Sequence, residues 1–289
     1  MQKIYKNLEQ SLIGTTEDLF SMGLDVSSRG TNQKELLFQN LTILDPTDVG
    51  ISNPARKFNA NYAFTEWLWY LSGDPSVKNI GKFAKIWLDI QDENGNVESN
   101  YGTYLMGTQW LWVLKELKKD KDSRRCTMVV HQPMHKHKNQ ADLPCTQYIQ
   151  FFIRNNKLHM GVSMRSNDVI YGYCNDVFTF TLFQQLMLND LRAIYPDLEL
   201  GNYHHFAGSM HIYERHYEMA KNILDINKIG YKQDSKIYKL KNDSITGELN
   251  CILKVEGATQ LSIPIAEGNT DYQTYLAWVA DGNTAEASD

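Results

Sequence analysis

The residue with the clearest chemical potential in this chain is Cys145, a cysteine that directly follows a proline. The proline ring fixes the backbone ahead of the thiol, so the run Leu143-Pro144-Cys145-Thr146 holds it at the entrance of an expected strand. A lone cysteine is most often a small buried core residue. Its thiolate is the nucleophilic form, and nearby cations favour it. Spacing alone therefore favours a structural role. The groups around Cys145 must show whether it is a core residue or a nucleophile.

Several arginines stand at places where they could bind a phosphate. Arg29 lies in the polar segment 27–31, Arg124 and Arg125 are adjacent, and Arg165 is followed by Ser166. A guanidinium fork binds two phosphate oxygens at once, and a hydroxyl adds a donor. Taken alone, Arg124 and Arg125 are better explained as the solvated junction of a helix and a strand.

An acidic residue, Asp176, and two ring donors, His211 and Tyr213, complete the candidate site residues. Asn175 and Asp176 stand at the start of an apolar helix expected over 176–194. Either could cap that helix, but burial at the mouth of an apolar helix also raises the pKa of a carboxyl group. His211 and Tyr213 suit two contacts to a sugar hydroxyl, although a polar helix start also explains them.

The elements that must position these groups are of both kinds. Apolar residues at helical spacing predict helices over 3–21, 59–72, 104–119, 176–194 and 211–225. A β-rich middle predicts strands over 125–130, 146–153 and 158–165, with a hairpin turn at Asn155-Asn156. Alternation along 158–165 puts Arg165 at the end of the polar face of that strand. Segments 27–31 and 91–100 are expected to be loops.

Composition shifts after about residue 228. We therefore expect a catalytic domain over 1–228 and an extension over 229–289 with weak strand patterns and a flexible end at 282–289. The 289 residues, 42% hydrophobic and 22% charged, are typical of a soluble globular protein. A net charge of −5 argues against a general nucleic-acid binder.

The four cysteines, Cys126, Cys145, Cys174 and Cys251, form no CxxC pair, which excludes a zinc knuckle or a thioredoxin-type motif. No signal peptide or membrane-spanning run is recognisable, so we expect free thiols in a cytoplasm. The run His135-Lys136-His137 has no cysteine or carboxylate at ligand spacing. It is interpreted as an exposed loop, and no metal is expected.

Together these segments resemble the thymidylate synthase family, in which a synthase and several pyrimidine hydroxymethylases share one fold. The resemblance covers roughly residues 5–225 and is highly specific between Asp122 and His216, where order, spacing and identity agree. It implies an α+β fold with a mixed β-sheet packed with helices. It also implies a homodimer in which one face of the sheet forms the interface.

The resemblance implies roles residue by residue. Cys145 matches the nucleophile, Glu66 matches the glutamate that organises water and proton transfer, and Tyr101 matches the tyrosine near the reacting carbon. Trp87 and Ile90 match positions on the side of the folate co-substrate, 5,10-methylenetetrahydrofolate. The implied substrate-binding residues are Arg29, Arg124, Arg125, Gln150, Arg165, Ser166, Asn167, Asp168, His211 and Tyr213. Of these, Arg124 and Arg125 are expected to reach the site of the other subunit.

Departures from the synthase pattern are equally informative. Thr146 stands where synthases have histidine, Asp176 stands where they have the asparagine that reads uracil, and Ile90 replaces a second tryptophan. These changes resemble the deoxycytidylate hydroxymethylases of phages, which implies the cytoplasm of an infected bacterium. Ser166 resembles the deoxynucleotide version of the family. The usual folate-closing C-terminus of synthases is not recognisable.

The implied chemistry explains why such groups are needed. Addition of a thiolate at C6 of a pyrimidine turns C5 into a nucleophile. A protonated Asp176 complements cytosine, because its OH donates to N3 and its carbonyl accepts from the N4 amino group. The resemblance therefore implies conversion of dCMP to 5-hydroxymethyl-dCMP, with Glu66 acting on the water that hydrates an exocyclic methylene.

Three alternatives stay open from the sequence. The chain could be a thymidylate synthase that methylates dUMP, or a CMP hydroxymethylase that acts on a ribonucleotide. A phage structural or binding protein without catalytic activity is the third. Product mass, substrate preference and release of the C5 hydrogen distinguish them.

Overall fold

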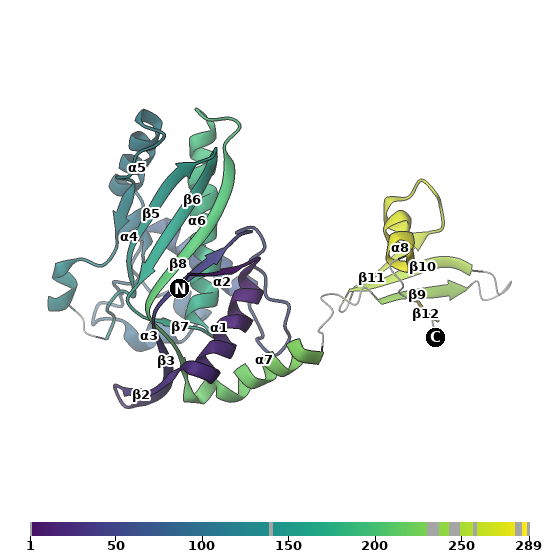
Figure 1. Ribbon diagram of the computed structural model, residues 1–289, viewed down its shortest axis with the longest axis horizontal. Coiled ribbons are helices and arrows are strands. Elements are labelled where there is room, and N and C mark those ends of the chain that lie inside the picture. The colour runs from purple at the N-terminus through teal and green to yellow at the C-terminus, as the bar shows by residue number, and fades with distance from the viewer. Residues whose placement is uncertain are drawn as a thin grey trace. The chain divides into compact units, whose positions relative to one another are not determined.

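Strands β3 (Thr31–Ile43) and β8 (Glu199–Tyr213) form the centre of a mixed eight-stranded sheet (Figure 1). The structure is a computed structural model that describes residues 2–138, 141–229, 237–242, 249–256, 259–280 and 285–287. The sheet order is β1-β3-β8-β6-β5-β4, β2 pairs with β3, and β7 pairs with β8. The remaining bounds are β1 Gln2–Tyr5, β2 Leu24–Ser28, β4 Thr127–Val129, β5 Thr146–Arg154, β6 Lys157–Met164 and β7 Asn167–Asp168.

Both strand directions occur in this sheet: β3 is antiparallel to β8, whereas β6 is parallel to β8. Helices α1 (Leu8–Met22) and α6 (Gly172–Arg192) pack on the sheet, and α2 (Ala60–Ser72) packs on α6. The other helical segments are η1 Ile80–Lys82, α3 Ile86–Ile90, α4 Gly102–Leu105, α5 Thr108–Lys119, η2 Pro133–His137, η3 Glu214–His216 and α7 Tyr217–Ile229. The α+β fold class is confirmed.

The predicted helices differ from the observed ones mainly at their ends. Helix 59–72 is confirmed: Asn59 caps it through the Tyr62 N–H, and Gly73 ends it in the left-handed region at φ 61°. Helix 3–21 was wrong at its start, where residues 2–5 form β1. Helix 104–119 is two helices, because Gly107 breaks it at φ 80°. Helix 211–225 begins late, because β8 continues to Tyr213.

The predicted strands around Cys145 are confirmed to within a residue at each end. Asn155 and Asn156 both have positive φ angles, 50° and 57°, which is the two-residue turn that a hairpin favours. The expected loop at 27–31 is instead the tip of the β2–β3 hairpin, where Arg29 has φ 50°. The expected loop at 91–100 is confirmed.

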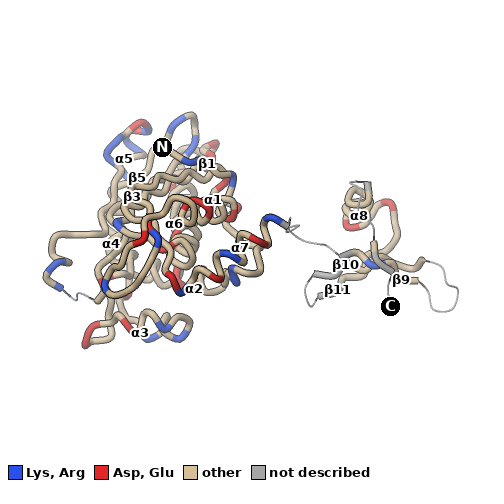
Figure 2. Tube along the Cα trace, turned by 60° about the horizontal axis from the view of Figure 1, so that its bottom comes forward, with Lys and Arg blue, Asp and Glu red and all other residues tan. Residues whose placement is uncertain are grey.

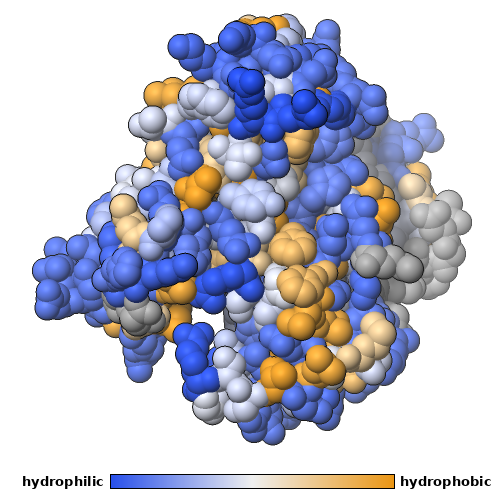
Figure 3. Space-filling view, turned by 60° about the vertical axis from the view of Figure 1, so that its left-hand side comes forward, coloured by the Kyte–Doolittle hydropathy of each residue, from blue (hydrophilic) through white to orange (hydrophobic). Residues whose placement is uncertain are grey.

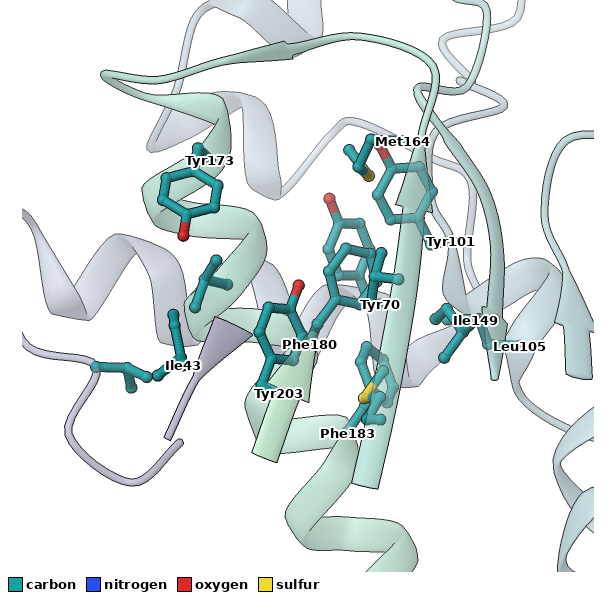
Figure 4. Packing of buried hydrophobic residues seen from close by; sticks show 14 of the residues in the cluster. Ile43, Tyr70, Tyr101, Leu105, Ile149, Met164, Tyr173, Phe180, Phe183 and Tyr203 are labelled. Carbon is teal, nitrogen blue, oxygen red and sulfur yellow. The ribbon is translucent and has the colours of Figure 1, made fainter. Parts of the chain in front are cut away.

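Between the sheet and α6 lies a core rich in aromatic rings (Figure 4). Tyr101 stacks on Tyr70 at 5.1 Å and on Phe180 at 5.9 Å between ring centroids. Its hydroxyl end points toward Met164, which β6 contributes. This stack brings α2, α6 and the segment before α4 together below the end of β6.

Other side chains of the sheet remain outside this core. Tyr148, Gln150, Phe152 and Phe206 line a separate groove, and the exposed Phe38 stacks on Phe206. Apolar side chains also gather in patches on the surface in Figure 3. Charged residues of both signs are interspersed along loops and helix ends in Figure 2.

The chain divides into two compact units, Met1–Ile229 and Gly230–Asp289. In the second unit, strands β11 (Thr259–Pro264), β10 (Leu249–Glu256), β9 (Ile237–Asn242) and β12 (Glu286–Ala287) form a sheet in that order. Helix α8 (Thr270–Ala280) packs Tyr275 and Trp278 against Tyr238. The expected flexible end at 282–289 lies largely outside the described residues. No helix in the described ranges is long and apolar enough to cross a membrane.

Candidate active site

One pocket of about 380 Å³ gathers most of the residues that the sequence singled out. Those that line it are Arg29, Glu66, Trp87, Ile90, Tyr101, Cys145, Arg165, Ser166, Asn167, Asp168, Asp176, His211 and Tyr213. They come from the β2–β3 hairpin, α2, α3, the ends of β5, β6 and β8, and α6. Some of these residues meet because β7 follows β6 along β8, which places Asn167 and Asp168 beside Met210 and His211.

Three of the expected site residues do not line this pocket. Gln150 lies in the groove on the sheet, where its Nε2 donates to the Arg124 carbonyl at 3.0 Å, and its expected place near the nucleotide stays a prediction. Arg124 and Arg125 line a different hollow beside Glu116 and Asp120. Their expected reach into a second subunit stays a prediction.

The backbone that carries Cys145 is held by the arginine that follows β6. Arg165 donates three hydrogen bonds to this segment: Nε to the Pro144 carbonyl at 3.1 Å, Nη2 to the Leu143 carbonyl at 2.7 Å, and its backbone N–H to the Cys145 carbonyl at 2.8 Å. Burial raises the pKa of the Cys145 thiol, while Arg165 and, more weakly, Arg29 act in the opposite direction. The arginines favour the thiolate as expected, but burial outweighs them.

Asp176 lies in the second turn of α6, because this helix begins at Gly172. The expectation that Asn175 or Asp176 caps the helix is therefore wrong. Asp168 instead accepts the Tyr171 N–H at 2.9 Å at the start of α6. Burial raises the pKa of Asp176 to about 7, although the Asn167 side-chain amide donates to its Oδ2 at 2.7 Å. Near neutral pH this carboxyl is therefore partly protonated.

Glu66 is the second buried acid of the pocket. The Tyr62 hydroxyl donates to Glu66 Oε1 at 2.8 Å, and the Trp87 indole N–H donates to the Tyr62 hydroxyl at 3.0 Å. Burial raises the pKa of Glu66 to about 8, and the charge of Asp176 adds to the shift. A carboxyl group with such a pKa can exchange protons at neutral pH, which suits a general acid or base.

Ring donors and one cation lie at the ends of β2 and β8. Both ring nitrogens of His211 are buried, and neither makes a well-formed hydrogen bond within the described residues. Burial lowers the pKa of His211, although Asp168 and the Ser209 backbone oppose that shift. Tyr213 lies edge-on to His211 at 4.8 Å between ring centroids. A buried, unpaired imidazole is suited to a polar ligand group such as a hydroxyl.

Several residues of the pocket were missed from the sequence: Tyr62, Tyr70, Ile86, Ser99, Asp142 and Tyr171. Tyr62 precedes Glu66 by one helical turn, and this spacing could have identified it. Asp142 lies three positions before Cys145, but its bond to Ser99 spans too much of the chain to be predicted. The expected exposed loop at 135–137 is right for the exposure of Lys136 and His137, but the segment is the helix η2 and His135 is buried. The described residues hold no group of three His, Cys, Asp or Glu side chains suited to a metal.

Comparison with known proteins identifies the family to which this chain belongs. The chain matches the family described as thymidylate synthase over residues 47–246. The chain belongs to the thymidylate synthase family. Its structure is similar to a thermostable thymidylate synthase A from Bacillus subtilis, with a TM-score of 0.64, 23% identity, and coverage of 76% of this chain and 84% of that one.

Similar sequences within this family include phage enzymes. Deoxycytidylate 5-hydroxymethyltransferase of Enterobacteria phage T6 is 33% identical over 173 residues, which cover 56% of this chain and 70% of that protein. The T4 protein of the same name is 32% identical over the same shares. A thymidylate synthase of Vesicomyosocius okutanii is 29% identical, over 54% of this chain and 61% of that protein. Family membership supports one-carbon transfer to a pyrimidine.

Thymidylate synthases generally use methylenetetrahydrofolate, and the residues present here fit a flat, partly apolar co-substrate. Helix α3 presents Ile86, Trp87 and Ile90 to the pocket. Ile86 is 56% exposed, so its apolar surface is free to be covered. The indole N–H of Trp87 is already used by Tyr62, which leaves ring surface and not a donor for a ligand.

Proposed function

We propose that this chain converts dCMP to 5-hydroxymethyl-dCMP, using methylenetetrahydrofolate as the carbon donor. The observation that carries the proposal is Asp176, a buried carboxyl group whose pKa is raised to about 7 in the same pocket as Cys145. A carboxylic acid there donates to N3 of cytosine and accepts from its amino group, whereas uracil offers the reverse pattern.

Asn167 supports this assignment because its bond to Asp176 occupies only one lone pair of one carboxyl oxygen, which leaves both oxygens able to contact the substrate. Its amide donates to Oδ2 of Asp176, so a carboxylic acid proton is best placed on Oδ1, where it could face N3. The carbonyl oxygen of Asn167 is itself buried without a partner in the described residues, and it could accept from the N4 amino group. Together, the two side chains complement the polar edge of cytosine.

Nucleotide binding in this proposal depends on cations and ring donors around the pocket. Arg29, Arg165 and Ser166 would bind the phosphate, while His211 and Tyr213 would bind the sugar. Arg124 and Arg125 of a second subunit would complete the phosphate site, with one face of the sheet as the dimer interface. The first unit would then be the catalytic domain.

In the proposed reaction, the Cys145 sulfur adds to C6 and Asp176 donates a proton to N3. Bound methylenetetrahydrofolate would supply the carbon atom that joins C5, and Trp87, Ile86 and Ile90 would hold it. Loss of the C5 hydrogen as a proton and separation of this carbon from the folate would leave an exocyclic methylene at C5, and Glu66 would take a proton from the water that adds to it. Departure of Cys145 from C6, with return of the N3 proton to Asp176, would restore the ring. Tyr101, whose hydroxyl bonds to Thr146, would fix the position of the base.

The decisive experiment is mass spectrometry of the product formed from dCMP and methylenetetrahydrofolate. A gain of CH2O is expected. A gain of CH2 from dUMP, with dCMP unchanged, would refute the proposal and favour a thymidylate synthase. CMP turning over faster than dCMP would favour a ribonucleotide enzyme. No release of the C5 hydrogen from any pyrimidine nucleotide would favour a binding protein.

A further inference from the structure

A buried carboxylate ties the segment before Cys145 to the segment that carries Tyr101. Asp142 is 4% exposed, and its Oδ2 accepts the Ser99 backbone N–H at 2.9 Å. Its Oδ1 accepts the Ser99 hydroxyl, and the Glu98 backbone N–H also donates to the carboxylate. Asp142 and Ser99 both line the pocket. We refer to this pair as the Asp142–Ser99 clamp.

An outer layer of polar contacts supports the clamp. Glu98 accepts from the Tyr104 hydroxyl and pairs with Lys138 at 2.7 Å. The buried His135 accepts the Gln132 N–H through Nδ1 at 3.0 Å, so Nε2 carries the proton of the neutral ring and donates to Tyr104 at 2.8 Å. These contacts join η2 to the segment between Glu98 and Tyr104. The segment before Cys145 is thus held by the Asp142–Ser99 clamp and by the polar contacts of η2.

The clamp lies within electrostatic reach of both groups that it joins. The charge of Asp142 raises the pKa of Cys145 and of Tyr101, in addition to the larger effect of burial. Other contacts of the pocket have separate supports: Arg29 is on a hairpin, and His211 and Tyr213 are on β8. Arg165 is the exception, because it donates to the Leu143 and Pro144 carbonyls beside Asp142. A change in the clamp should therefore move Cys145 and Tyr101 more than it moves Arg29, His211 and Tyr213.

We propose that Asp142 is a positioning residue that, through Ser99, sets the placement of Cys145 relative to Tyr101. Its effect on turnover rests on the function proposed above, whereas its effect on the thiol does not. A misplacement of about 1 Å between reacting groups can lower a rate by about 100-fold. Loss of the clamp should accordingly reduce kcat by a larger factor than it raises the KM for the nucleotide.

The kinetic test compares four variants with the wild-type chain. Asp142→Asn and Ser99→Ala each remove part of the clamp, and Ser99→Thr keeps the hydroxyl as the conservative rescue. Asp190→Asn is the matched control, since Asp190 accepts a tryptophan N–H at 2.9 Å outside the pocket. We expect kcat for dCMP to fall roughly 10- to 100-fold in the first two variants, and to recover in Ser99→Thr. A rise of KM with unchanged kcat, or an equal loss in Asp190→Asn, overturns the assignment.

A second test needs no substrate and stays informative if the chain acts on another nucleotide. Iodoacetamide labelling of each cysteine is followed by peptide mass spectrometry. We expect Cys145 to react faster in Asp142→Asn, which removes a charge that raises its pKa, by up to about tenfold for each unit by which that pKa falls. The fully buried Cys126 and Cys174 should stay unlabelled, which reports an intact fold. Labelling of Cys145 at the wild-type rate in Asp142→Asn refutes the action of the clamp on the thiol.

Discussion

Replacing Asp176 by asparagine should reverse the base preference of the site. Asparagine has nearly the size of aspartate, and at this buried position on α6 it can still form a hydrogen bond with Asn167. The acid proton on this side chain is lost. Asparagine turned to serve uracil accepts from N3–H and donates to O4, the opposite of what the acid offers cytosine. Asp176→Asn should therefore weaken the reaction of dCMP and support that of dUMP.

The expected magnitude follows from two hydrogen bonds to a buried base edge. An unpaired buried donor or acceptor costs about 1–3 kcal/mol, so two mismatched contacts amount to roughly 2–6 kcal/mol. At about 1.4 kcal/mol for each factor of ten, kcat/KM for dCMP should fall between roughly 30-fold and 20,000-fold. Because an amide is also a very poor acid, the larger value is expected.

The assay measures kcat/KM for dCMP and dUMP with both proteins under the same folate concentration. Release of the C5 hydrogen is recorded beside product formation, since it reports addition of Cys145 without carbon transfer. Asn175→Ala, next along α6, is the control for a general disturbance of this helix. An unchanged ratio of the two kcat/KM values in Asp176→Asn would refute the recognition of cytosine by Asp176.

Three further predictions concern the other charged groups of the pocket. Glu66→Gln should lower kcat by roughly 100- to 10,000-fold while Cys145 still releases the C5 hydrogen of the substrate; loss of both activities together would contradict a role confined to water. Burial raises the folded-state pKa of Asp176 to about 7 and of Glu66 to about 8, above their ordinary values of 3.8 and 4.5. The protonated acids therefore contribute their full free energy of stabilisation below about pH 4, and this contribution is lost as pH rises through 7–8. The Tm of Glu66→Gln should accordingly fall less than that of the wild-type chain between pH 6 and about pH 9. Parallel curves of Tm against pH would refute the raised pKa of Glu66. Arg165→Lys keeps the charge but cannot make both side-chain bonds to the Leu143 and Pro144 carbonyls, so kcat should fall and KM for the nucleotide should rise, and a wild-type response would show that charge alone suffices.

Local patterns predicted the parts of the fold that depend on neighbouring residues. The strands on either side of Asn155-Asn156 and the capped helix α2 follow from alternation, turn residues and a cap, all of which act over a few positions. Strands β3 and β8 were not predicted, because their pairing joins residues such as Leu41 and His205 across most of the chain. Long-range pairing has no local signal of this kind.

The site residues were likewise predicted where local sequence identified them and missed where long-range contacts position them. Glu66, Cys145 and Asp176 were identified from residue types in recognisable runs, and the structure brings them into one pocket. That Gln150 lies in a separate groove was not predicted, because on a strand one position decides the face, and register is not visible in a run of residues. Asp142 was overlooked, since its importance comes from Ser99, a partner far away in sequence.

The chain of bonds from Trp87 to Glu66 runs in one direction, and this decides where an acid proton can be. An indole N–H can only donate, so the Tyr62 oxygen accepts it and the single Tyr62 proton goes to Oε1 of Glu66. With Oε1 engaged as an acceptor, the proton that Glu66 holds below pH 8 lies on Oε2. Every proton that Glu66 gains or gives up must therefore pass through one oxygen. If the proposed hydration takes place, the reacting water must lie where Oε2 can reach it.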